Sequence, residues 1–188
     1  MKNLTIENMN EVSINKSINL SEHFTLGELC KTSAKTPDGN IPSHVHIENL
    51  KRLCGWLEKL RERYNLRYVL RSVSPPKFFA EQSGKAERGG EEDTEEPIVI
   101  NSGYRSEAVN KSVGGVKGSN HLTGCAVDIR VAGIEQAMRY AVILMDYADE
   151  TKQDYDEILI EKNRYGAIWL HFAVRPTDNR RKTMFLQK

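Results

Sequence analysis

Two histidines and one aspartate stand where they could hold a metal ion. Residues 119–128 read S-N-H-L-T-G-C-A-V-D, so that His121 precedes Asp128 by seven positions. His171 follows in the apolar run W-L-H-F. Two imidazoles and one carboxylate suit Zn²⁺, although Co²⁺, Mn²⁺ or Ni²⁺ accept the same ligands. Three protein ligands leave the fourth tetrahedral position open for water, which is the arrangement of a catalytic zinc site.

Strand alternation supports two of these ligands. The β-like segments 125–131 and 168–174 each carry apolar residues at every second position. Because successive side chains of a strand point to opposite faces, Asp128 and His171 both leave the apolar faces of their strands. Each also has an alanine two positions away, which leaves room for an ion and a substrate.

His121 needs a turn to reach Asp128. Seven residues of extended chain would hold the two apart by more than about 20 Å. Gly124 lies between them and can take the backbone angles that a sharp reversal requires. The sequence therefore predicts that the chain turns back at Gly124.

The elements that must carry these residues are helices early in the chain and strands late. Apolar residues at three- and four-residue spacing predict amphipathic helices at about 45–64 and 134–147. Short helices are expected behind Thr25 and Ser106. Strand-like segments stand at 68–70, 98–100, 125–131, 157–161, 168–174 and, as an edge strand, 182–186. This order predicts a single α+β domain, with an antiparallel sheet that carries the zinc site and helices packed on one side.

Two segments are expected to lie outside the packed domain. Residues 1–20 are polar and predict a flexible lead-in, so the domain is expected to span 21–188. Residues 74–96 contain Pro-Pro, Gly-Gly and an acidic run, which predicts a disordered insertion because such a stretch buries little apolar surface.

Composition bounds the possible partners and the compartment. The 188 residues include 27 basic and 26 acidic side chains, which gives no electrostatic argument for nucleic acid as a partner. No apolar run approaches the roughly 18 residues of a membrane span, and no signal peptide is visible. We therefore expect a chain made in the cytoplasm, which would reach a substrate outside the membrane only by a phage-type or other non-classical route. The oligomeric state is not indicated.

The joint pattern S-x-H-x-x-G-x-A-x-D, followed by W-x-H in a strand, resembles the zinc D-alanyl-D-alanine carboxypeptidase family. That family includes vancomycin-resistance dipeptidases and phage L-alanyl-D-glutamate endolysins, and the Hedgehog signalling domain shares its fold and metal site. The resemblance is strongest over residues 101–131 and 157–174. It implies that His121, Asp128 and His171 bind one Zn²⁺ ion.

The resemblance also implies an activity and roles for neighbouring residues. Arg105 matches a family arginine close to the metal, where it would bind substrate or stabilise an oxyanion; the alternative is a surface arginine at a helix start. Trp169 is expected to contact substrate, and Ser119 either contacts substrate or orders the turn before His121. The implied reaction is hydrolysis of an amide bond in a peptidoglycan stem peptide or its precursor. A D-Ala-D-Ala carboxypeptidase and an endolysin-type endopeptidase both stay open.

The general base is where this chain departs from many relatives. They carry an acid three residues before the last histidine, a position that Ile168 occupies here. The nearest candidate is Glu161: if a hairpin aligns it with Trp169, Glu161 lies diagonal to His171. Other carboxylates that could act as the base are Asp154, Asp156 and Glu157.

The missing acid keeps other functions open. The domain could hold zinc without catalysis, as a cell-wall-binding or structural module. It could also be a metal hydrolase that acts on a different amide.

Overall fold

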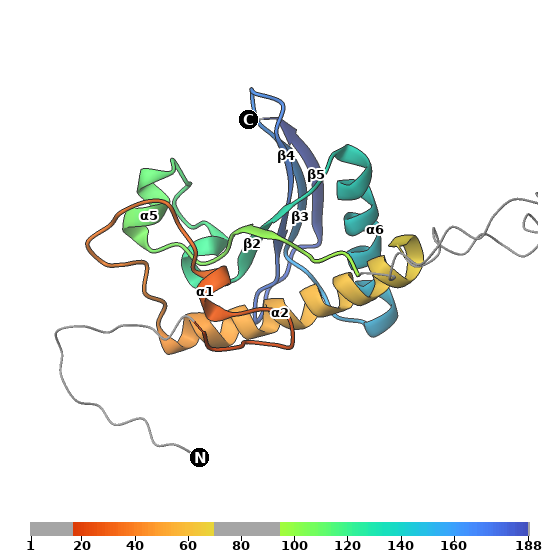
Figure 1. Ribbon diagram of the computed structural model, residues 1–188, viewed down its shortest axis with the longest axis horizontal. Coiled ribbons are helices and arrows are strands. Elements are labelled where there is room, and N and C mark those ends of the chain that lie inside the picture. Colours follow the sequence, from red (N-terminus) through yellow and green to blue (C-terminus); the bar gives the residue numbers. More distant parts are fainter. Residues whose placement is uncertain (1–16, 70–94, 188) are drawn as a thin grey trace, which may run out of the picture.

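The computed structural model describes residues 17–69 and 95–187 (Figure 1). Its helical elements are α1 (Leu26–Leu29), α2 (His44–Tyr64), the π-helix η1 (Asn65–Val69), α5 (Glu107–Ser112), the 3₁₀ turn η2 (Asn120–Thr123) and α6 (Ile134–Thr151). Its strands are β1 (Ile100–Ser102), β2 (Ala126–Arg130), β3 (Glu157–Lys162), β4 (Ile168–Ala173) and β5 (Lys182–Gln187). The expected lead-in and insertion fall largely outside the described residues, so both stay predictions.

The five strands form one sheet in the order β1-β2-β4-β3-β5. Neighbours pair antiparallel from β1 to β3, and β3 and β4 form the expected hairpin. The edge strand β5 is an exception, because it runs parallel to β3. The structure thus confirms an α+β domain, but its sheet is mixed and not antiparallel throughout.

The direction of β5 follows from where the chain leaves β4. Ala173, the last residue of β4, pairs with Glu157, the first residue of β3. The loop 174–181 passes this end of β3, and β5 begins at Lys182 beside the same Glu157. Strand β5 therefore runs antiparallel to β4 and parallel to the strand between them.

The long helices α2 and α6 cover one face of the sheet (Figure 1). Their apolar stripes and the matching face of the strands share a core of fully buried side chains, among them Leu50, Leu53, Leu57, Leu60, Ile129, Ile158, Leu170 and Phe172. The opposite face of the sheet carries the polar residues Asp128, His171, Glu157 and Glu161. The prediction of helices packed on one side is confirmed, and the other side is left for a site. No helix in the described parts of the chain is both long and apolar enough to cross a membrane.

The strand expected at 68–70 is absent from its described residues. The chain instead continues from α2 into the π-helix η1. Asn65 fixes this extension: its side-chain amide donates to the carbonyl of Arg61, at 3.0 Å, and also exchanges two hydrogen bonds with the backbone of Glu96. Tyr68 packs against Tyr64, with ring centroids 5.4 Å apart. These contacts outweigh the local β propensity of Tyr68 and Val69.

Candidate metal centre

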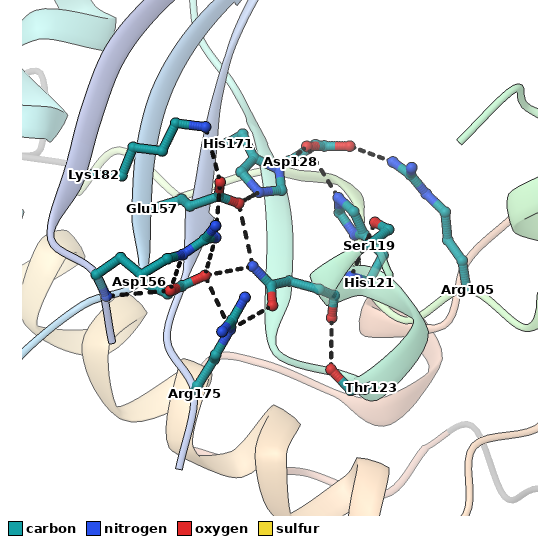
Figure 2. A network of polar contacts seen from close by, with 12 residues as sticks. Arg105, Ser119, His121, Thr123, Asp128, Asp156, Glu157, His171, Arg175 and Lys182 are labelled. Atoms are coloured by element: carbon teal, nitrogen blue, oxygen red, sulfur yellow. Dashed lines mark hydrogen bonds and ion pairs between the residues drawn. The ribbon is translucent and has the colours of Figure 1, made fainter. Parts of the chain in front are cut away.

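The structure brings His121, Asp128 and His171 together from three separate elements. Asp128 on β2 is the direct register partner of His171 on β4. His171 Nδ1 lies 2.9 Å from Asp128 Oδ1, and His121 Nε2 lies 3.3 Å from the same oxygen (Figure 2). One donor atom from each residue lies within 4.8 Å of the others.

The turn that carries His121 is built by its own sequence. Ser119 caps the 3₁₀ turn η2, and its hydroxyl accepts from the backbone N–H of His121 at 3.3 Å. Gly124 ends the turn with φ at +71°, which confirms the reversal expected there. Its N–H donates to the carbonyl of His121, at 3.2 Å. Ser119 therefore orders the turn, which is one of the two roles expected for it.

The ring of His121 is held in one orientation. Its Nδ1–H donates to the carbonyl of Gly103, at 2.7 Å, which leaves the Nε2 lone pair directed toward Asp128. Metal-binding histidines usually donate their other ring N–H in this way, because the bond fixes the tautomer and the ring plane. The Gly103 backbone is itself packed tightly against Leu29, whose carbonyl oxygen would lie 2.2 Å from an added Cβ.

The donor types and two of the three donor-atom separations match a tetrahedral zinc ion. Metal–ligand bonds of about 2.0–2.1 Å place tetrahedral donor atoms about 3.3 Å apart. The separations of 2.9 and 3.3 Å at Asp128 Oδ1 are close to this value. All three side chains are nearly buried, with 2% of His121, 9% of Asp128 and 8% of His171 exposed. A buried charge is usually paired with another charge or bound to a metal. Asp128 is paired with Arg105 and His171, and it also belongs to the group that could hold a metal.

The ionisation of the three groups is coupled. Burial would raise the pKa of Asp128, but the two histidines hold it well below its usual range. Burial lowers the pKa of His121 and favours its neutral form. Burial also opposes charge on His171, yet its hydrogen bond to Asp128 and the nearby Glu157 carboxylate raise its pKa to about 9. A metal must therefore displace a proton from His171 at neutral pH.

Arg105 lies against the metal ligands and not on the open surface. Its Nη2 is hydrogen-bonded to Asp128 Oδ2, and its Nε donates to the hydroxyl of Ser102 at 2.8 Å. Its backbone N–H also donates to the carbonyl of His121, at 3.1 Å. Only 17% of the side chain is exposed, which disfavours the alternative of a surface arginine.

Glu157 forms a second layer behind His171, a role that the sequence did not reveal. Its Oε2 lies 3.6 Å from His171 Nε2 and accepts from the amide of Asn120 at 3.2 Å (Figure 2). Its Oε1 lies 3.0 Å from Arg180 Nη2. The nearby imidazole of His171 and the nearby cations outweigh burial and lower the pKa of Glu157 to about 2. Such a carboxylate stays ionised at neutral pH and is a poor proton acceptor.

Two further carboxylates are also unsuited to act as the base. Asp156 is fully buried and holds Arg180 through two hydrogen bonds of 2.8 and 2.7 Å, with Arg175 Nε 3.1 Å away. Although burial opposes it, hydrogen bonds from Arg180 and from an asparagine amide lower the pKa of Asp156. Asp154 is 53% exposed and pairs with Arg181, at 2.9 Å. Neither carboxylate is placed to take a proton beside the metal ligands.

Glu161 lies on the face of the sheet that carries the metal ligands. The hairpin pairs it with Trp169, as expected, so that it is diagonal to His171. Diagonal neighbours across a sheet are about 7–8 Å apart, within reach of a glutamate and one water. Glu161 is only 4% exposed. Ile168, which stands where many relatives carry an acid, belongs to the opposite strand face.

One cleft of about 750 Å³ contains the three expected metal ligands together with the expected base and substrate-contacting residues. Its lining includes Arg105, Ser119, His121, Asp128, Glu161, Trp169 and His171. A second cavity of about 680 Å³ adjoins it beyond Ser119 and Asn120. The metal ligands, a carboxylate, an arginine and an aromatic side chain thus share one concave site, which is the usual form of an active site.

Asn120, Arg175 and Arg180 complete the polar network around this cleft. Arg175 lies beside Asp156 in this network (Figure 2). Asn120 lies inside the S-N-H motif, but nothing in that motif indicates that its amide reaches Asp156 at 2.7 Å. Both arginines come from the irregular loop 174–181, where no periodic pattern could have singled them out.

Comparison with known proteins agrees with this geometry. A search of curated proteins gave no match. Residues 88–153 match the family described as Peptidase M15, a stretch that includes His121 and Asp128 but ends before His171. This match supports the resemblance to the zinc D-alanyl-D-alanine carboxypeptidase type of M15 peptidase for residues 88–153.

Proposed function

We propose that the protein is a zinc-dependent peptidase that hydrolyses an amide bond in peptidoglycan stem peptides or their precursors. The observation that carries the proposal is the convergence of three buried donor atoms within 4.8 Å of one another, in a cleft that also holds Glu161 and Arg105. The family match supports peptide hydrolysis, and the resemblance in the metal motif supports the stem peptide as substrate.

His121, Asp128 and His171 would hold the ion. When bound there, Zn²⁺ supplies a lowered pKa for water and polarisation of the scissile carbonyl. Glu157 and the Gly103 carbonyl would keep the two imidazoles in their binding orientations.

Two side chains of the cleft would act on the substrate. Glu161 would accept a proton from the attacking water and deliver it to the leaving amine nitrogen. Arg105 orients Asp128 through one N–H, and its remaining donors would meet the developing oxyanion or a substrate carboxylate. Trp169 and Ser119 line the cleft and would contact the peptide.

Defined stem peptides test this function. The zinc-loaded protein is incubated with L-Ala-γ-D-Glu-L-Lys-D-Ala-D-Ala, and the products are identified by mass spectrometry. We expect cleavage of either the L-Ala-D-Glu or the D-Ala-D-Ala bond, abolished by a chelator and restored by zinc. An intact peptide, despite one bound zinc per chain, would reject the peptidase and favour a non-catalytic zinc module.

A further inference from the structure

Strand β5 adds one cation to the cleft beside the metal centre. Its register places Lys182 next to Glu157 and Leu186 next to Glu161, on the face that carries the metal ligands. Both β5 residues line the cleft. Strand β5 therefore forms one wall of the cleft, and Lys182 is the only charged residue that the strand contributes to it.

Lys182 is weakly engaged by the protein. Its Nζ lies 3.4 Å from Glu157 Oε1, longer than the about 2.7–2.9 Å of a charge-assisted hydrogen bond. Arg180 lies closer to the same oxygen, at 3.0 Å, so Lys182 is not needed to neutralise Glu157. The Lys182 side chain is 40% exposed, and an ammonium has three donors to offer.

The other cations that line the cleft are committed to buried or half-buried partners. Arg105 binds Asp128, while Arg175 and Arg180 bind the fully buried Asp156. Among the four cations of the described cleft lining, Lys182 thus lies farthest from its nearest protein carboxylate oxygen, at 3.4 Å.

The charge of the cleft favours an anionic ligand. Its four cations are balanced by Asp128, Glu157, Glu161 and the adjacent Asp156. With both imidazoles neutral, a divalent ion would leave two positive charges in excess. A concave site of this sign attracts anionic substrates.

The position of Lys182 sets where that anionic group would lie on a peptide. His171 Nε2 is 3.6 Å from one oxygen of Glu157, and Lys182 Nζ is 3.4 Å from the other. The ammonium is therefore less than roughly 10 Å from the His171 ring, which corresponds to at most about three residues of extended peptide at about 3.3–3.6 Å each.

We propose that Lys182 binds a substrate carboxylate within about three residues of the scissile bond and makes the protein selective for acidic stem peptides. This inference rests on the proposed peptidase function. The stem peptide offers two such groups, the α-carboxylate of its γ-linked D-glutamate and its C-terminal carboxylate. Lys182 would act on substrate affinity and not on the chemical step.

Three synthetic peptides separate these sources. The first is L-Ala-γ-D-Glu-L-Lys-D-Ala-D-Ala, the second carries a carboxamide in place of the D-glutamate α-carboxylate, and the third is amidated at its C-terminus. Dissociation constants are measured by calorimetry with zinc-loaded protein bearing Glu161→Gln, and mass spectrometry verifies that each peptide survives the titration. The same three peptides are then assayed for turnover by the parent protein.

We expect one of the two amidations to weaken binding about tenfold. Lys182→Met should weaken binding of the unmodified peptide by the same factor and leave binding of that amidated peptide unchanged. The affinity of Lys182→Arg should stay within about threefold of the parent. Lys162→Met is the matched control, because Lys162 ends β3 on the opposite strand face from Glu161. Lys182→Gln gives a second neutral side chain if the methionine variant unfolds.

Equal affinity for all three peptides, or an equal loss for all three on Lys182→Met, would overturn the inference. Failure of the proposed function gives a different result: a peptide binds the parent protein but is never cleaved. If none of the three peptides binds, both this inference and the proposed function are overturned.

Discussion

Replacing Gly124 by alanine tests whether the turn before β2 holds the metal centre together. Gly124 has φ at +71°, and an added Cβ would lie 2.7 Å from the carbonyl oxygen of His46, in the first turn of α2. The neighbouring atom belongs to the backbone, so it cannot rotate away as a flexible side chain could. Either α2 or the turn that carries His121 must move.

The expected cost has two parts. A non-glycine residue in the left-handed conformation costs about 1–2 kcal/mol. The close contact adds an overpacking cost of about 1–3 kcal/mol. Gly166→Ala is the matched control, because Gly166 has φ at +89° with no atom within 4 Å of its added Cβ, and it should show only the first part.

Urea unfolding of the metal-free proteins measures both substitutions. We expect Gly124→Ala to lose about 2–5 kcal/mol of unfolding free energy, against about 1–2 kcal/mol for Gly166→Ala. A chelator competition assay should show weaker zinc binding for Gly124→Ala alone, because the contact with His46 displaces the turn that carries His121. Equal losses for the two variants, or unchanged zinc affinity, would refute the reasoning.

Two further predictions concern the carboxylates of the cleft. Glu161→Gln keeps the size of the side chain but removes its proton acceptor, so zinc affinity should stay within about threefold while turnover falls about 10²–10⁴-fold. The surface variant Glu135→Gln is the control for kinetics, and turnover of Glu161→Gln near the parent value would reject Glu161 as the base. The pKa of Glu157 is lowered from 4.5 to about 2, so its contribution to stability is fully present above pH 4.5 and is lost as the pH falls toward 2. The melting temperature of metal-free Glu157→Gln should therefore fall less steeply than that of the parent below pH 4.5; parallel curves would contradict this.

Local sequence pattern was sufficient to predict the central part of the site. The period of two along β2 and β4 places Asp128 and His171 on the same sheet face, because a buried opposite face fixes the strand phase. A glycine at position 124 predicts the reversal, because few other residues take its backbone angles. The pairing of Glu161 with Trp169 followed from a short loop between two strands.

Contacts between distant segments could not be predicted in this way. The direction of β5 depends on the path of loop 174–181 past the start of β3, which no local pattern specifies. Asn120 and Asp156 stand 36 positions apart and meet only when η2 packs beside β3. The strand expected around Tyr68 failed because the side chain of Asn65 bonds to Glu96 and continues the helix.

A zinc titration of the metal-free protein, followed by peptide cleavage, tests the proposed function most directly. Cleavage of the unmodified stem peptide should rise linearly and stop rising at one equivalent of zinc. His171→Ala should abolish that break, because it removes one of three ligands. Cleavage that persists in excess chelator, or a protein saturated with one zinc that leaves the peptide intact, would contradict the proposal.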